Sequence, residues 1–203
     1  GDMDPAVAAP YACSGLTAFS ALKKIPDTLS EDWIIIIGAG GVGINGILLS
    51  SAVHKAKILV IDNNKEKRDK AIEAGAHAAF SPDEEDKIRN IVGIGASAAI
   101  DFVGMPETTD LALSLVKKGG MVVVIGLYGG SLKLSLPLVP MRSITLRGSY
   151  VGELRELREL VDIIKSGTIK LMPVKRQDLS TANQAMSDLR AGKVNGRIVL
   201  IPN

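Results

Sequence analysis

Cysteine is almost absent from this sequence, since Cys13 is the only one among 203 residues. A single cysteine excludes an intrachain disulfide, and scarce cysteine is typical of proteins that work in a reducing compartment. Long apolar runs are missing as well: the longest have the length of a β-strand, and no signal peptide or membrane-spanning segment is visible. We therefore expect a soluble, cytoplasmic protein without a membrane partner.

Aromatic residues and an excess of basic charge are also missing. Aromatics make up 3% of the chain, and the formal net charge at pH 7 is +2. So few aromatics offer no platform for stacking bases, and no region forms a basic stripe, so we expect no nucleic-acid partner. A composition with 46% hydrophobic and 23% charged residues is that of a globular protein with a substantial core.

Glycine is concentrated directly after a run of four isoleucines, Ile34 to Ile37. Uninterrupted β-branched residues predict a strand that is buried on both faces. Gly38, Gly40 and Gly43 then follow with the spacing Gly-x-Gly-x-x-Gly, which suits a sharp turn, close approach of a ligand to bare backbone, and tight packing of the next helix. That helix begins within the loop, so its free N–H groups, with Gly41 and Val42, would face a pyrophosphate.

An acid, Asp62, ends a second apolar strand, Lys57 to Ile61. In a dinucleotide-binding unit an acid at this place accepts hydrogen bonds from the adenosine ribose. A glycine-rich turn without a ligand is the alternative interpretation, but it explains neither the glycine spacing nor the acid.

The same carboxylate predicts which coenzyme binds, because it would repel a 2′-phosphate. One charge pair near 4 Å at an effective dielectric of about 20 is worth on the order of 4 kcal/mol before screening. Even a fraction of that energy gives a roughly tenfold to several-hundredfold preference for NAD. No arginine immediately follows Asp62, and Arg68 is more than a helical turn along the chain.

Strands alternate with helices along most of the chain, which predicts an α/β fold: a Rossmann doubly wound six-stranded parallel sheet with helices on both faces. We expect a helix from about Pro106 to Lys117, ended by Gly119 and Gly120. The ligand should lie at the carboxyl ends of the strands, beside the first one. The strands are expected at 33–37, 57–61, 78–80, 98–103, 121–125 and 144–148.

Further elements flank this sheet. We expect a short helical piece from Asp4 to about Tyr11 and a helix at 14–24 before it. An amphipathic helix from Glu153 to just before Gly167 follows, and its apolar stripe is too short for a coiled coil. A strand near Val174, a helix at 180–191 and a last strand at 197–201 resemble an element of another domain. The expected division is therefore hinge and N-terminal helices at 1–30, a Rossmann domain at 31–168, and a closing piece at 169–203.

Several segments along nearly the whole chain carry a resemblance to a known family. They are Ala9–Phe19, Gly38–Gly43, Asp62, Ile125–Leu127 and Gly196–Val199. In this order they resemble the zinc-dependent alcohol dehydrogenases of the medium-chain dehydrogenase/reductase superfamily. The resemblance implies that a GroES-like catalytic domain is largely missing and that the terminal pieces here belong to it. Since Gly1 and Asp2 precede the first methionine, we also expect a fragment of a longer protein.

The resemblance implies roles for individual residues around the nicotinamide. Thr17 matches a residue beside this ring, and Ser149 and Val151 match positions flanking its amide. The matched wall and backbone contacts are Val103, Ile125, Gly126 and Leu127.

Other matched positions concern the adenosine, the pyrophosphate and zinc. Asn63 and Lys67 match positions around the adenosine, and Arg197 matches an arginine that reaches the pyrophosphate; a solvated charge remains the alternative for both Lys67 and Arg197. Cys13 matches a ligand of the catalytic zinc in the complete protein, with a small buried thiol as the alternative. One cysteine cannot hold zinc tightly, so we expect no zinc in this chain alone. His54 and His77 are interpreted as ordinary surface or core histidines.

The leading interpretation is the NAD(H)-binding portion of a zinc-type alcohol or polyol dehydrogenase, which transfers hydride between a small alcohol or carbonyl substrate and nicotinamide. The chain alone should be inactive. A zinc-free quinone or enoyl reductase of the same superfamily and a non-catalytic NAD(H)-sensing or assembly module remain alternatives. The resemblance also implies a homo-oligomer formed through the region of the fifth and sixth strands, and the apolar segment 129–150 could pair there by exposed strand edges. The sequence does not distinguish between substrates.

Overall fold

A six-stranded parallel sheet forms the centre of the molecule. The computed structural model describes residues 3–194 and 196–202. The strand order is β3-β2-β1-β4-β5-β6, and every neighbouring pair is parallel. This is the order of the Rossmann fold, so the prediction of fold class is confirmed. The strands are β1 (Trp33–Ile37), β2 (Lys57–Ile61), β3 (Ala78–Phe80), β4 (Ala96–Asp101), β5 (Val116–Val124) and β6 (Thr145–Gly148).

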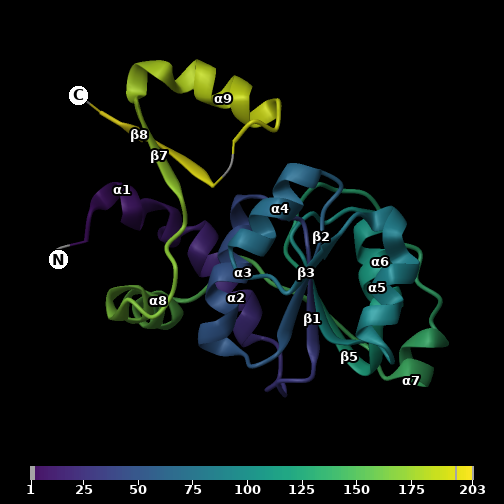
Figure 1. Cartoon of the computed structure of the whole chain (residues 1–203). Helices are drawn as coiled ribbons and strands as arrows, with labels where there is room; N and C mark the ends of the chain where they lie inside the picture. The colour runs from purple at the N-terminus through teal and green to yellow at the C-terminus, as the bar shows by residue number, and fades with distance from the viewer. Residues whose placement is uncertain (1–2, 195, 203) are drawn as a thin grey trace.

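Helices cover both faces of the sheet because successive residues of β1 point to opposite sides. Ile34 and Ile36 pack in one core with residues of α2 (Ser14–Lys23), α3 (Gly41–Val53), α4 (Lys65–Glu73) and α8 (Leu154–Ser166). Ile35 and Ile37 pack in a second core with residues of α5 (Glu85–Val92), which follows the short η2 (Pro82–Glu84), and of α6 (Pro106–Leu115). Figure 1 shows these two layers on either side of the sheet.

The two ends of the described chain lie together, away from the sheet (Figure 1). The closing segment forms a separate parallel pair of strands. Tyr11 joins the beginning of the chain to this end, since its hydroxyl accepts a hydrogen bond from the Met172 N–H at 2.9 Å. The elements of the two ends are α1 (Pro5–Ala8), η1 (Ala9–Ala12), β7 (Val174–Asp178), η3 (Leu179–Thr181), α9 (Ala182–Arg190) and β8 (Arg197–Ile201).

The expected boundary between α6 and β5 is wrong. The helix ends at Leu115, and Gly119 and Gly120 lie inside the long strand β5 rather than at the helix end. Gly119 has φ +77°, and the pairing of β4 with β5 shifts register between Ala96 and Ala98. The glycines therefore serve an irregularity of the strand. Strand β4 correspondingly occupies 96–101 instead of 98–103.

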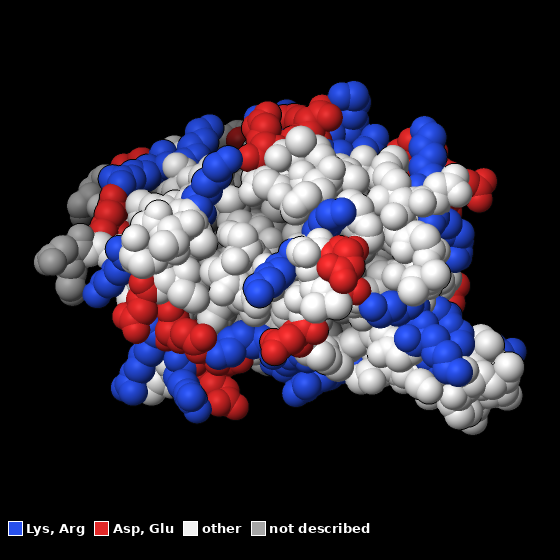
Figure 2. Space-filling view, turned by 60° about the horizontal axis from the view of Figure 1, so that its bottom comes forward, with Lys and Arg blue, Asp and Glu red and all other residues white. Residues whose placement is uncertain are grey.

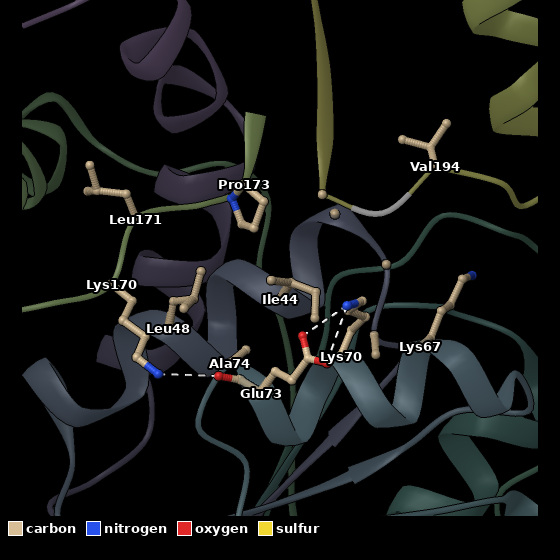
Figure 3. A pocket seen from close by; sticks show the side chains of 14 residues that line it. Ile44, Leu48, Lys67, Lys70, Glu73, Ala74, Lys170, Leu171, Pro173 and Val194 are labelled. Carbon is tan, nitrogen blue, oxygen red and sulfur yellow. Dashed lines mark hydrogen bonds and ion pairs between the residues drawn. The ribbon is translucent and has the colours of Figure 1, made fainter. Parts of the chain in front are cut away.

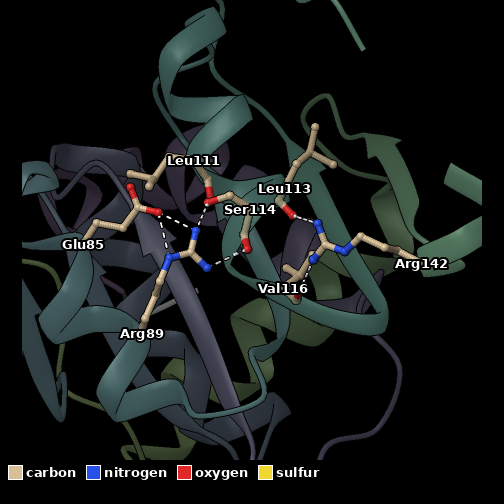
Figure 4. A network of polar contacts seen from close by, with 7 residues as sticks. All are labelled: Glu85, Arg89, Leu111, Leu113, Ser114, Val116 and Arg142. Atoms are coloured by element: carbon tan, nitrogen blue, oxygen red, sulfur yellow. Dashed lines mark hydrogen bonds and ion pairs between the residues drawn. The ribbon is translucent and has the colours of Figure 1, made fainter. Parts of the chain in front are cut away.

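Two arginines from other elements explain where α6 ends (Figure 4). Arg142 donates to the carbonyl oxygens of Leu113 and Val116 at 2.8 and 2.5 Å. Arg89 donates to the carbonyl oxygen of Ser114 at 3.3 Å and to its hydroxyl at 3.1 Å. Guanidinium groups here satisfy helix-end carbonyls that a glycine cap would otherwise serve. Arg142 belongs to α7 (Leu138–Arg142), a short helix that the sequence analysis missed.

The surface carries mixed charge. On the face in Figure 2, basic and acidic side chains are interspersed among uncharged ones, in the middle of the view as well as at its rim. Among the described residues, no helix combines the length and apolar character needed to cross a membrane.

Candidate functional site

The glycine-rich loop leaves bare backbone at the start of α3. Gly38 has φ +91°, and a Cβ on Gly43 would lie 1.8 Å from the Gly38 carbonyl oxygen, so both positions require glycine. Gly40 is exposed, precedes the first residue of α3, and would place a Cβ with no atom within 4 Å. The space beside Gly40, directly before the start of α3, is therefore open to a ligand.

Asp62 holds the loop from the end of β2. One carboxylate oxygen accepts a hydrogen bond from the Ala39 N–H at 2.8 Å, and the other accepts from the Asn64 N–H at 2.9 Å. The residue is 8% exposed. Each oxygen has a second lone pair, so the carboxylate can also accept hydrogen bonds from ligand hydroxyls.

The glycine-rich loop and Asp62 line one cavity of about 650 Å³ at the carboxyl ends of β1, β2 and β4. This is the place that the strand order predicts for a ligand. The cavity gathers nine of the residues proposed from sequence: Gly38, Gly40, Gly41, Val42, Gly43, Asp62, Asn63, Lys67 and Val103. It also contains residues that the sequence analysis missed, among them Met105, Thr108 and Tyr128.

A fully buried acid, Asp101, shapes the far wall of this cavity. One of its oxygens accepts from the N–H groups of Val103 and Gly104, both at 2.9 Å, and the other accepts from the hydroxyls of Thr108 and Thr109, both at 2.8 Å. Its exposure is 0%. Asp101 is thus a positioning residue for the turn between β4 and α6. Its position at the end of a parallel strand is the signal that could have identified it.

Of the residues proposed for the nicotinamide half, Val103 lines this cavity and the others do not. The others come from α2 and from the ends of β5 and β6: Thr17, Ile125, Gly126, Leu127, Ser149 and Val151. The loops after β4 and β5 touch backbone to backbone, since a Cβ on Gly104 would lie 1.9 Å from the Gly126 carbonyl oxygen. Leu127 is 79% exposed.

The loop after β6 has two unusual features. The Ser149 hydroxyl oxygen is buried and has no hydrogen-bond partner among the described residues. Val151, a β-branched residue, has φ +51°, a strained conformation that tends to occur at functional sites. This loop lies against α2, because a Cβ on the next residue, Gly152, would be 2.8 Å from Leu16. Thr17 therefore stands one residue from this contact, with its hydroxyl donating to the Cys13 carbonyl oxygen at 2.7 Å.

Arg197 brings the end of the chain to the glycine-rich loop. A Cβ on Gly41 would lie 2.6 Å from the Arg197 Nε. This nitrogen is buried and has no partner among the described residues. Burial lowers the pKa of the Arg197 guanidinium below its usual value, and the nearby Cys13 sulfur partly opposes the shift. A positive charge without a partner beside the helix start favours a bound anion.

The described residues offer no cluster of three or more histidine, cysteine or acidic side chains that could hold a metal ion. Cys13 is exposed and lies with Arg197 along a separate cavity of about 410 Å³. The donor set of this part of the chain therefore does not fit a tetrahedral zinc site.

The two histidines have structural contacts, as expected. His54 is buried, with Nε2 at 2.9 Å from the Leu22 carbonyl oxygen. His77 Nδ1 accepts a hydrogen bond from the Ile58 N–H at 3.0 Å, and the ring packs edge-on against Trp33.

The expectation that no arginine offsets the charge of Asp62 needs correction, because Arg68 lies close to Asp62 in space although it is more than a helical turn along the chain. The Arg68 Nη1 donates to the Asp62 carbonyl oxygen at 2.8 Å. The helix that follows β2 turns the arginine back toward the strand end, so a cation stands beside the acid.

Sheet order, glycine-rich loop and cleft define a Rossmann-fold domain of the kind that dinucleotide-binding proteins contain. The family model for zinc-binding dehydrogenases matches residues 41–166. The chain belongs to this family, within the medium-chain dehydrogenase/reductase superfamily.

Similar proteins are considerably longer than this chain. The NAD-dependent alcohol dehydrogenase of Sulfurisphaera tokodaii is 33% identical over 96% of the chain, which spans 57% of that protein. The D-arabinose 1-dehydrogenase (NADP(+)) of Saccharolobus solfataricus is 33% identical over 98% of the chain and 59% of its own length. The crystal structure of the alcohol dehydrogenase from Aeropyrum pernix superposes with a TM-score of 0.89 at 31% identity, covering 96% of this chain and 57% of that one.

Proposed function

We propose that this chain is the NAD(H)-binding portion of a zinc-type alcohol or polyol dehydrogenase. The observation that carries the proposal is the unpartnered Nε of Arg197 against Gly41, at the open start of α3. A pyrophosphate supplies the anion that both the guanidinium and the helix start favour. The bare loop, the cavity of about 650 Å³ and the acid at the end of β2 fit the adenosine half of the same molecule.

Each group has a defined task in this proposal. Asp62 accepts hydrogen bonds from the ribose, while its bonds to Ala39 and Asn64 keep the loop in place. Asn63 and Lys67 contact the adenosine side. On the nicotinamide side we assign Thr17, Val103, Ile125, Gly126, Leu127, Ser149 and Val151, and the buried Ser149 hydroxyl is free for a ligand amide. The bound coenzyme supplies a ring that accepts or gives a hydride, and the chain binds and orients that ring.

The preference for NAD rests on the Asp62 carboxylate, which opposes a 2′-phosphate. Arg68 reduces this repulsion because its guanidinium lies beside the Asp62 main chain. We therefore expect the lower end of the electrostatic range, roughly tenfold tighter binding of NADH than of NADPH. Equal affinities in a fluorescence titration would remove Asp62 as the selector.

We propose that this chain alone does not hold zinc, because the described residues bring no three suitable donor side chains together. In a longer protein, Cys13 would join ligands from the remaining residues and contribute a thiolate. We accordingly propose that this chain binds coenzyme but does not oxidise alcohol. We also propose that the longer protein has the same domain boundaries, with hinge and N-terminal helices at 1–30, a Rossmann domain at 31–168 and the closing piece at 169–203. The substrate is a small alcohol or carbonyl compound.

Two open glycines allow a sharp test of coenzyme binding. Gly40 and Gly148 each have room for a methyl group and an ordinary φ, so Gly40→Ala and Gly148→Ala should keep the Tm of the parent chain. Only Gly40 lies in the loop, where a methyl group would hold a pyrophosphate away from the backbone. In a titration monitored by energy transfer from Trp33 to NADH, we expect Gly40→Ala to weaken binding about tenfold or more and Gly148→Ala to leave it unchanged.

Other results would contradict the proposal. If the parent chain does not bind NADH, the coenzyme role of this chain fails. If Gly40→Ala binds as well as the parent, the pyrophosphate does not occupy the loop. Detectable alcohol oxidation by the pure chain would disprove its inactivity.

A further inference from the structure

A second cavity, of about 340 Å³, lies beside the glycine-rich loop, between α3, α4 and the segment that leads from α8 to β7 (Figure 3). Its walls are largely apolar. Ile44 and Leu48 of α3 are buried side chains on one wall, and Leu171, Pro173 and Val194 come from the closing part of the chain. A cavity of this size and lining is in the range that binds small molecules.

Positive charge surrounds this apolar cavity. Three lysines line it, Lys67, Lys70 and Lys170, against one acid, Glu73. The Lys70 ammonium pairs with the Glu73 carboxylate at 2.9 Å, and the Lys170 ammonium donates to the Glu73 main-chain carbonyl oxygen at 3.3 Å. Figure 3 shows Lys70 and Lys170 converging on Glu73 from opposite sides. Lys67 forms no hydrogen bond or ion pair with the described residues through its ammonium.

The contacts that Lys70 and Lys170 make with Glu73 can be replaced by contacts with a ligand at little cost in stability. The Lys70 and Glu73 side chains are 45% and 64% exposed, and an ion pair at such exposure contributes little to stability. Lys170 uses only one of its three donors on the carbonyl oxygen. A ligand carboxylate can therefore bind either ammonium group without a large loss of protein contacts.

We propose that this cavity binds a small amphipathic anion, a medium-chain carboxylate whose head group pairs with Lys70 or Lys170 and whose alkyl chain lies on Ile44 and Leu48. The apolar walls favour the chain, and the excess of lysine over acid favours the negative head group. A neutral molecule of the same shape gains only the apolar contacts with the walls. A short anion gains only the charge interaction with the lysines.

Occupation of this cavity should oppose coenzyme binding, an effect that rests on the proposed function. Gly40, Gly41 and Lys67 line both this cavity and the larger one. A second anion beside the loop repels the pyrophosphate, and the coupling is reciprocal. The cavity thus serves as an inhibitory site for the coenzyme domain.

Binding of the anion is tested first, without coenzyme. Isothermal titration of the full 203-residue chain with octanoate should give saturable binding, whereas octanol and acetate should each bind at least about tenfold more weakly. The double variant Lys70→Gln/Lys170→Gln should weaken octanoate binding about threefold to tenfold. Lys165→Gln, an exposed lysine on α8 outside the cavity, is the matched control and should change nothing.

A second variant tests the cavity itself, because it fills the space with a larger side chain and retains the lysines. Ala74 lines the cavity, so Ala74→Leu should reduce octanoate binding while the Tm shows that the chain is folded. Absence of octanoate binding, equal binding of octanol, or equal losses in Lys165→Gln and the double variant would each overturn the proposal.

The coupling is then measured by NADH titration with and without saturating octanoate. We expect octanoate to weaken NADH binding about threefold to tenfold. Unchanged NADH affinity would overturn the inhibitory role. Binding of octanoate by a chain that does not bind NADH would leave the anion site standing and refute the coenzyme function, so the two failures are distinguishable.

Discussion

Arg197 connects distant parts of the sequence through one side chain. It begins β8, yet its guanidinium lies against Gly41 at the start of α3. Sequence alone left two interpretations of this residue, an anion contact or a charge at a strand edge. A buried nitrogen without a partner favours the anion contact, because an unsatisfied buried donor is costly unless a ligand completes it.

Substitution of Arg197 should therefore affect only ligands with a pyrophosphate. A charge-assisted hydrogen bond contributes about 1.5–3 kcal/mol, so Arg197→Gln should weaken ADP-ribose and NADH binding roughly tenfold to hundredfold. Adenosine binding should stay unchanged. Arg190→Gln, at an exposed arginine of α9, is the control, and calorimetric titration of all three ligands is the measurement. Equal weakening of adenosine would assign Arg197 to the structure of the loop instead.

Asp62 and Asp101 differ in how readily the sequence reveals them. Asp62 follows a clear apolar strand at the distance from the glycines that a ribose contact requires. Asp101 also ends a strand, but the strand was expected to continue to residue 103, which hid its position at the edge. Its four hydrogen bonds come from residues 103–109, so its role depends on a turn geometry that the sequence pattern does not contain.

At the scale of elements, strands flanked by strong turn signals are predictable and those shaped by distant contacts are not. Strands β1, β2, β3 and β8 have the expected bounds, because apolar runs stop at glycine, polar or proline residues. The end of α6 depends on Arg89 and Arg142, which come from α5 and α7. Capping by side chains from other elements leaves no signal in the sequence of the helix itself. From sequence alone the glycines at 119 and 120 therefore indicate the end of the helix, although they lie inside β5.

The capping role of Arg142 can be measured as stability. Its side chain makes two hydrogen bonds to carbonyl oxygens near the end of α6, so Arg142→Gln should lower the free energy of unfolding by about 1–3 kcal/mol. Urea denaturation followed by circular dichroism gives this quantity. Arg155→Gln, on the exposed side of α8, should change it by less than about 0.5 kcal/mol. A loss no larger than that of the control would exclude the capping role.

Asp32 connects three strands at their amino ends, on the side of the sheet opposite the candidate ligand site. Its carboxylate accepts from Lys117 of β5 at 2.8 Å, from Ser97 of β4 at 2.5 Å, and from the Leu29 N–H at 2.9 Å. The Lys117 hydrogen bond, followed by those from Ser97 and Leu29, lowers the pKa of Asp32 to about 2. Because the pKa in the folded chain is below that in the unfolded chain, this group stabilises the fold above about pH 4 and loses that effect as the pH falls to about 2.

Replacement by asparagine should remove this pH dependence. With the pair partly screened by solvent, we expect Asp32→Asn to cost about 1–2 kcal/mol at neutral pH, and the difference from the parent chain should shrink between about pH 4 and pH 2. Urea denaturation across that range is the measurement, with Asp27→Asn, at an exposed loop position, as control. A difference that stays constant down to about pH 2 would show that the charge of Asp32 is not what stabilises the strands.

At the scale of the whole molecule, the sequence indicated a main sheet and a separate closing piece, and the structure has both. What it could not indicate is how the closing piece lies against the sheet domain. That arrangement depends on single contacts, such as Tyr11 with Met172 and Arg197 with the glycine-rich loop. The closing part of the chain lines the smaller cavity, whereas residues between Ile37 and Tyr128 line the larger one, and the two cavities share Gly40, Gly41 and Lys67.

The free edge of the sheet leads to a prediction about assembly. Strand β6 is the last in the sheet order, and all four of its residues are exposed. Exposed apolar side chains lie on and near it, with Leu136 at 76%, Met141 at 68% and Leu146 at 46%. An edge with unpaired N–H and C=O groups can pair with its own copy about a twofold axis, since each chain offers the same surface to the other. We therefore propose a homodimer formed through β6.

Sedimentation should give twice the 21.4 kDa of one chain. The double variant Met141→Lys/Leu146→Lys places like charges across the twofold axis and should shift the chain to monomer, because facing like charges and lost apolar burial both oppose association. Met186→Lys alters an equally apolar, 51% exposed methionine on α9 and should leave the dimer intact. A parent chain that sediments only as a monomer would contradict pairing at β6, whereas a dimer that survives the double variant but not Met186→Lys would move the interface to the closing segment.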